Sequence, residues 1–134
     1  MTSLKEIKGL RDLNAEQLRA AGTTSVQSLR ERGATPAGRK ELAASLNVSE
    51  QQVLEWVNRA DLHRIKGIGE EYSDLLENAG VDTVAELAQR NPANLSAKLA
   101  EVNAAHNLVR RLPTPKQVED WVAQAKALPR GINY

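Results

Sequence analysis

The sequence contains no cysteine and no phenylalanine, and it has only two tryptophans and two tyrosines among its 134 residues. The absence of cysteine excludes disulfides and thiolate metal sites, which suits a reducing cytosol. With so few aromatic residues, the core must be built mainly from Leu, Ala, Val and Ile. This composition favours a helical protein, and we expect an all-α fold.

The chain also lacks an excess of charge and a long hydrophobic run. Eighteen basic residues face seventeen acidic ones, which leaves a formal net charge of +1. No global field therefore draws the protein to DNA or to an anionic membrane, so any nucleic-acid binding must be local. No segment is long enough to span a bilayer, and the residues after Met1 form no apolar signal core. We expect a soluble, cytoplasmic protein without a cofactor.

One pattern occurs twice, at an offset of 58 residues. Its second copy, residues 65–87, contains the turn Gly67-Ile68-Gly69, and glycine reaches the positive φ that such a turn needs. The helix that follows carries apolar residues at helical spacing and stops at Gly80. The matching residues of the first copy are Ile7, Lys8, Gly9, Leu10, Leu18, Gly22, Val26 and Leu29.

Toward the ends of the two repeats, the distance in sequence between matching residues increases from 58 to 65. Val53, Trp56, Val57 and Ala60 then match Val118, Trp121, Val122 and Ala125. About seven residues are therefore inserted between Leu99 and Thr114. Short helices at residues 3–7 and 61–65 are expected to open the two repeats. We expect a first repeat at residues 1–62, a second with an insertion at 63–129, and a loose tail at 130–134.

Together these patterns resemble a bacterial family of small tandem helix-hairpin-helix proteins that is classed as a domain of unknown function. The similarity rests on the duplicated Ile-Lys-Gly, the Ala-Gly helix stop, the helix at residues 38–43 and the closing Trp-Val helices, and it covers nearly the whole chain. It implies an all-α fold of two tandem helix-hairpin-helix (SAM-like) repeats of about five short helices each. It implies no established activity, and fold analogy alone does not carry function.

The wider helix-hairpin-helix class occurs in DNA repair, recombination and replication proteins, where its usual role is to bind a duplex backbone without regard to sequence. Its glycine turns expose N–H groups at a helix start, where the dipole also favours an anion. Glu70 and Glu71 oppose this role, because they would repel phosphate. The candidate phosphate contacts are Lys8, Gly9, Arg11, Lys66, Gly67 and Gly69. Secondary basic contacts are expected at Arg39, Lys40, Arg110 and Arg111.

The first repeat also matches the spacing of a helix-turn-helix, with Asn47 at the turn. The helix after this turn would offer Ser49, Glu50, Gln51 and Glu55 to bases, with Arg39, Lys40 and Arg59 near phosphates. Two carboxylates suit a DNA groove poorly, and the same pattern serves the packing of any two helices.

A protein-interaction module is the alternative, with hairpins used only for packing. Leu54 stands where the second repeat has Glu119, so it is a candidate interface residue. Catalysis is not expected, because His63 and His106 lie in non-matching places and no carboxylate pair stands out. We expect a non-enzymatic module, monomeric or weakly dimeric, whose partner is double-stranded DNA or a protein, with no small-molecule substrate and no membrane contact.

Overall fold

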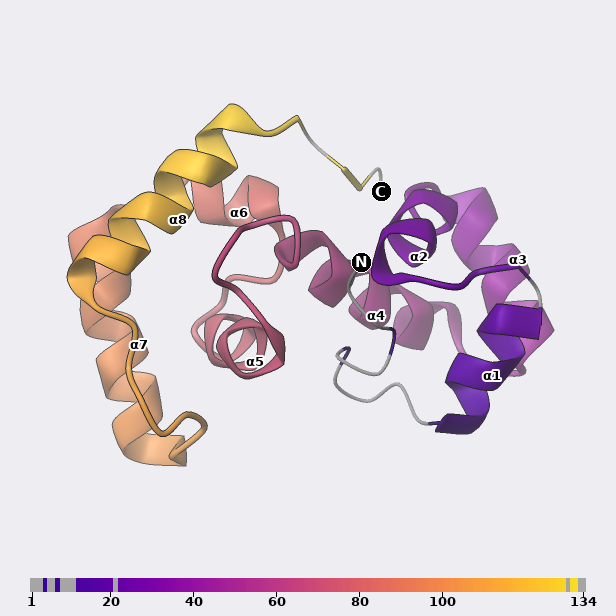
Figure 1. Ribbon diagram of the computed structural model, residues 1–134, viewed down its shortest axis with the longest axis horizontal. Coiled ribbons are helices and arrows are strands. Elements are labelled where there is room, and N and C mark those ends of the chain that lie inside the picture. Colours follow the sequence, from indigo (N-terminus) through magenta and orange to yellow (C-terminus); the bar gives the residue numbers. More distant parts are fainter. Residues whose placement is uncertain (1–3, 5–6, 8–11, 21, 130, 133–134) are drawn as a thin grey trace. The chain divides into compact units, whose positions relative to one another are not determined.

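A computed structural model describes residues 4, 7, 12–20, 22–129 and 131–132 of the chain (Figure 1). These residues form eight α-helices and no strand, as the composition predicted. They fall into two compact units. Unit 1 takes in the chain up to His63 together with Gly131 and Ile132, and unit 2 begins at Arg64 and ends before Gly131.

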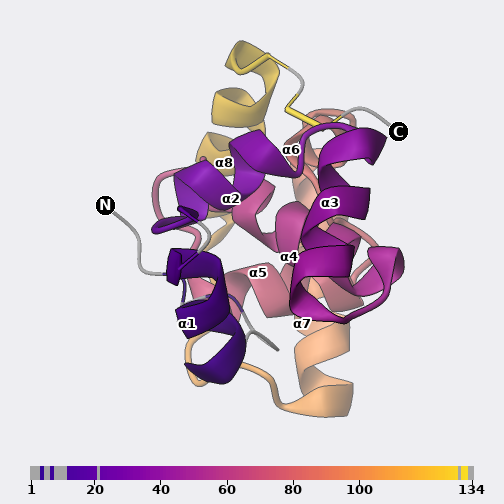
Figure 2. The same cartoon turned by 90° about the vertical axis from the view of Figure 1, so that its right-hand side faces the viewer.

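Unit 1 contains α1 (Asp12–Ala20), α2 (Val26–Arg32), α3 (Pro36–Leu46) and α4 (Glu50–Leu62). The helices α2 and α3 pack against α4, and α1 packs against α3. Figure 2 shows the first three helices grouped around α4. The apolar stripe of α4 forms the centre of this core, with Trp56 only 1% exposed.

Unit 2 contains α5 (Glu70–Asn78), α6 (Val84–Ala88), α7 (Pro92–His106) and α8 (Pro115–Ala127). Here α6 and α7 pack against α8, and α5 packs against α7. The buried tryptophan of this unit is Trp121, also 1% exposed, on α8.

Local signals explain where most of these helices begin and end. Gly22 and Gly80 have φ of +92° and +91°, in the left-handed region that ends a helix at low cost for glycine. Six helices begin at a residue whose side chain accepts a backbone N–H from the first turn, a cap that stabilises a helix by about 0.5–2 kcal/mol. These caps are Ser25, Thr35, Ser49, Thr83, Asn91 and Thr114.

The helix bounds of the two units correspond closely. The helices α1 and α5 both have nine residues and begin 58 residues apart, whereas α4 and α8 both have thirteen and begin 65 apart. The extra residues of unit 2 lie between these pairs. Part of them lengthens α7 to fifteen residues against eleven in α3. The connection that follows is also longer, since it covers residues 107–114 in unit 2 but only 47–49 in unit 1.

The expected count of five helices per repeat differs from the four α-helices described in each unit. Residues 61–65 do not form a separate helix, because Asp61 and Leu62 continue α4 and the N–H of His63 still donates to the carbonyl of Arg59 at 3.3 Å. Most of residues 3–7 lies outside the described part of the chain.

The stretch 130–134, expected as a loose tail, contains a core residue. Ile132 is 2% exposed and belongs to the hydrophobic core of unit 1. Removing an isoleucine side chain from water is favourable by roughly 1.5–3 kcal/mol, which explains why it packs.

Candidate functional site

A tight turn at residues 65–69 precedes α5. The N–H of Ile68 donates to the carbonyl of Ile65 at 3.2 Å, and both isoleucines are buried. Lys66 and Gly67, between them, are exposed. Gly67 has φ of +99°, which confirms the predicted need for glycine at this position. Gly69 has φ of −106°, so no positive φ is required there.

Gly67 is required for a second reason, since it lies against the indole of Trp121. A Cβ atom at this position would be 3.0 Å from Trp121 Nε1, a distance shorter than ordinary van der Waals contact. The turn thus packs on the buried tryptophan of α8.

Gln124, one turn further along α8, holds the backbone of the turn. Its Oε1 accepts the N–H of Lys66 at 2.9 Å, and its Nε2 donates to the carbonyl of Lys66 at 3.2 Å. The same Nε2 donates to Asp120 Oδ2 at 2.8 Å, which orients the amide. The N–H and the carbonyl of Lys66 are therefore both held by hydrogen bonds, although Lys66 is exposed.

The start of α5 differs from the starts of the six capped helices. Its N-cap residue is Gly69, which has no side chain to accept the first-turn N–H groups. The first intrahelical bond runs from Ser73 to the carbonyl of Gly69, so the amides of Glu70, Glu71 and Tyr72 have no acceptor within the helix. These donors and the helix dipole together favour an anion. The exposed side chains of Glu70 and Glu71 act in the opposite direction.

Tyr72 connects this helix start to the 107–113 loop. Its hydroxyl donates to the carbonyl of Arg111 at 3.0 Å, and its ring lies 5.2 Å from that of Trp121, with the planes tilted by 55°. Long side chains on a helix lean toward its N-terminus, so the loop lies beside the first turn of α5. Two sets of candidate residues that are far apart in sequence, at the 65–69 turn and at Arg110 and Arg111, are thus brought into one region of unit 2.

This region carries three exposed cations: Lys66, Arg110 and Arg111. Among the described residues, none of the three forms an ion pair. Their charges are therefore available to an external anion, and they lie on segments held by Gln124 and Tyr72.

The other candidates in unit 1 have different surroundings. Lys8, Gly9 and Arg11 lie outside the described residues. Arg39 is 6% exposed and its Nη1 donates to the carbonyl of Gly33 at 2.8 Å, so this guanidinium takes part in packing and is not a surface phosphate contact. Lys40, on the same helix, is exposed.

The residues of the helix-turn-helix hypothesis also have structural roles. Asn47 is in the left-handed conformation, with φ of 55°, and ends α3. Ser49 caps α4, and Arg59, expected near phosphates, is only 9% exposed.

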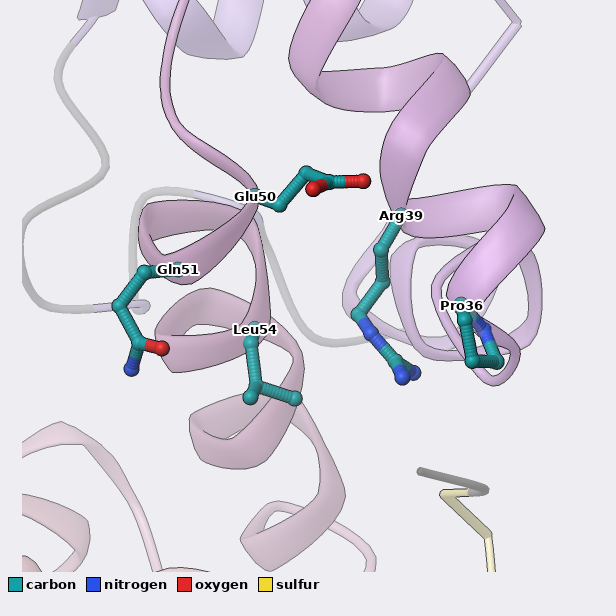
Figure 3. Close-up of a pocket in the computed structure, with 5 residues that line it drawn as sticks. All are labelled: Pro36, Arg39, Glu50, Gln51 and Leu54. Carbon is teal, nitrogen blue, oxygen red and sulfur yellow. The ribbon is translucent and has the colours of Figure 1, made fainter.

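A pocket of about 210 Å³ lies between α3 and α4, partly open to solvent. Figure 3 shows Pro36 and Arg39 on one side of it, with the three residues from α4 on the other. Leu54, the candidate interface residue, is half-buried and lines this pocket, whereas its counterpart Glu119 is exposed. The side chains from α4 are Glu50, Gln51 and Leu54.

Two side chains that hold this region together, Gln124 and Tyr72, were not among the predicted site residues. Gln124 aligns with Arg59 at the 65-residue offset, so the repeat pattern did not mark it. Tyr72 is half-buried, and its hydroxyl bonds to the carbonyl of a residue 39 positions away, which no local pattern indicates.

The described part of the chain contains no group of three or more His, Asp or Glu side chains arranged to hold a metal ion. Among the same residues, no helix has the length and hydrophobicity needed to cross a bilayer.

Comparison with solved structures found no significant match to this chain. Comparison with protein families matches residues 8–128, nearly the whole chain, to a domain of unknown function (DUF4332). The chain therefore belongs to the DUF4332 family.

Proposed function

We propose that this protein is a non-enzymatic binding module of two helix-hairpin-helix repeats, and that the hairpin of unit 2 binds the phosphate backbone of duplex DNA without sequence preference. The repeat assignment is supported by the matching helix bounds of the two units and by the equivalent glycine stops at Gly22 and Gly80. The single observation that carries the binding proposal is the uncapped start of α5 at Gly69, beside a turn held by Gln124.

The chemistry of this region suits a phosphodiester. Rigid N–H donors at a helix start bind a phosphate oxygen without losing backbone entropy, and Lys66, Arg110 and Arg111 supply charge around it. These amides and cations are placed to contact the phosphate backbone, and none of them is placed to contact a base edge. The binding is therefore not sequence-specific. Three neutralised phosphates predict a slope of about −3 in a plot of log K against log salt concentration, and a Kd of roughly 1–100 µM at physiological salt.

The test is the affinity for a random-sequence duplex, measured by fluorescence anisotropy from low to physiological salt. Gly69→Asn and Gly69→Asp both place a capping oxygen on the first-turn amides. If those amides bind phosphate, both variants lose about tenfold or more in affinity while their thermal stability is kept or raised. Gly69→Ala is the matched control, because nothing lies within 4 Å of its Cβ and it adds no acceptor.

Two results would contradict the proposal in different ways. If only Gly69→Asp weakened binding, charge alone would account for the interaction and the amides would have no role. If the wild-type protein bound no DNA even at low salt, the hairpin would be a packing element only.

A protein adaptor is the second candidate, and the pocket between α3 and α4 favours it. Leu54 presents a partly exposed apolar side chain there beside Glu50 and Gln51. Leu54→Glu introduces the residue that unit 2 has at the matching position. This variant should leave DNA binding unchanged if the hairpin carries it, so a loss of DNA binding would place the contact in unit 1 instead.

A further inference from the structure

The 107–113 loop exposes Leu112, whose side chain is 40% exposed and is the only exposed large apolar side chain among the described residues. A single exposed leucine is ordinary on a protein surface. Leu112 differs from an isolated surface leucine because it directly follows two exposed arginines, Arg110 and Arg111. The loop contains no acidic residue.

The backbone of this loop is held at several points. Asn103 on α7 accepts the N–H of Val109 at 2.9 Å and donates to its carbonyl at 3.2 Å. Tyr72 donates to the carbonyl of Arg111, and Pro113, whose ring fixes its own φ, is buried. Leu112 therefore stays exposed on a fixed backbone, and little conformational entropy is lost when it binds.

The loop is also what distinguishes unit 2 from unit 1. The connection between α3 and α4 consists of residues 47–49, which form one short turn and the N-cap of α4. The corresponding connection in unit 2 extends over residues 107–114 and reaches the start of α5 through Tyr72.

We propose that Leu112 forms a wedge that enters the minor groove of duplex DNA while Arg110 and Arg111 contact the phosphates beside it, and that this wedge makes the module prefer distorted over continuous duplexes. This inference rests on the proposed function. A leucine that enters between base steps partly unstacks them. The loop has two exposed arginines and no acidic residue, which favours an anionic duplex over a protein partner. The carboxylates of Glu70 and Glu71, at the neighbouring helix start, act against this attraction.

The wedge predicts which DNA the module selects. Inserting Leu112 into a continuous duplex requires unstacking, which costs a few kcal/mol per step. A nick or a mismatch has already lost part of that stacking. We expect a duplex with a central nick to bind about tenfold more tightly than the same duplex without it.

The experiment measures anisotropy with both duplexes for four variants in the same buffer. Leu112→Ala should abolish the preference for the nicked duplex and leave the affinity for the continuous duplex and its salt slope unchanged. Leu112→Met, which keeps an apolar side chain of similar length, should retain the preference. Lys66→Ala should weaken both complexes equally, and Leu54→Ala in unit 1 should change neither. Circular dichroism checks that each variant keeps its helical content.

The outcomes separate this inference from the function on which it rests. Salt-dependent binding without a preference, or a preference that survives Leu112→Ala, would overturn the wedge and leave the hairpin proposal intact. A preference that Leu112→Ala removes while the salt slope persists would support both. Absence of binding to either duplex at low salt would overturn both, and the loop would then be assigned to a protein partner.

Discussion

The two units have equivalent packing positions and different surface positions. Trp56 and Trp121 stand at matching places and are each 1% exposed. One turn further along the same helices, however, unit 1 has Arg59, 9% exposed, where unit 2 has Gln124, whose amide accepts the N–H of Lys66 in the 65–69 turn. The repeated pattern therefore marks the core, whereas the candidate binding region depends on positions at which the repeats differ.

The largest expected effect comes from the two tryptophans. Trp56→Ala and Trp121→Ala should each lower the free energy of unfolding by about 3–5 kcal/mol, measured by urea denaturation, because each leaves a large cavity in its own unit. Only Trp121→Ala should also abolish DNA binding, because Trp121 supports Gly67 and Tyr72.

Phenylalanine variants serve as controls where the alanine variants do not fold. Trp121→Phe keeps most of the packing and should keep most of the binding. Equal losses of DNA affinity in Trp56→Phe and Trp121→Phe would contradict the assignment of binding to unit 2.

Two glycines with positive φ, one in each unit, are expected to have intermediate effects on stability. Gly22→Ala holds an alanine at a positive φ, but the added Cβ meets no atom within 4 Å. This variant should lower the free energy of unfolding by about 1–2 kcal/mol. Gly67→Ala has the same backbone strain together with the 3.0 Å approach to Trp121, and should cost more, up to about 3 kcal/mol. Thermal denaturation of both variants measures the difference. Equal costs would mean that the indole shifts freely and does not hold the turn.

The smallest expected effect concerns Glu70 and Glu71. Their carboxylates complement the dipole of α5, so Glu70→Gln and Glu71→Gln should each cost a few tenths of a kcal/mol of stability. The same changes remove repulsion of phosphate and should raise DNA affinity about two- to fivefold at low salt, measured by anisotropy. Unchanged or lower affinity would show that the phosphate does not approach this helix start.

Much of the fold could be predicted from the sequence because its signals are local. The composition predicted an all-α protein, and the repeated Ala-Gly stops lie where α1 and α5 end. The two tryptophans that match between the repeats are both buried. The predicted break before Asp61 is absent because α4 continues without a breaker to Leu62. Local sequence also could not predict the burial of Ile132, which depends on the core of unit 1.

The candidate site was predictable only in part. The glycine turn and the adjacent cations are visible in the sequence, since each is defined by neighbouring residues. Their juxtaposition is not, because it depends on Gln124 and Tyr72 bonding to residues 58 and 39 positions away. The burial of Arg39 likewise arises from tertiary packing, which local charge patterns do not report.

The burial of Ile132 has a consequence for the order in which the chain can fold. The core of unit 1 is assembled from helices near the beginning of the chain and from one residue that follows the whole of unit 2. During synthesis, a ribosome completes unit 2 before the last side chain of the unit 1 core emerges. Until then the core of unit 1 lacks one of its side chains, and adding it requires a contact between residues far apart in sequence, a kind of contact that forms slowly.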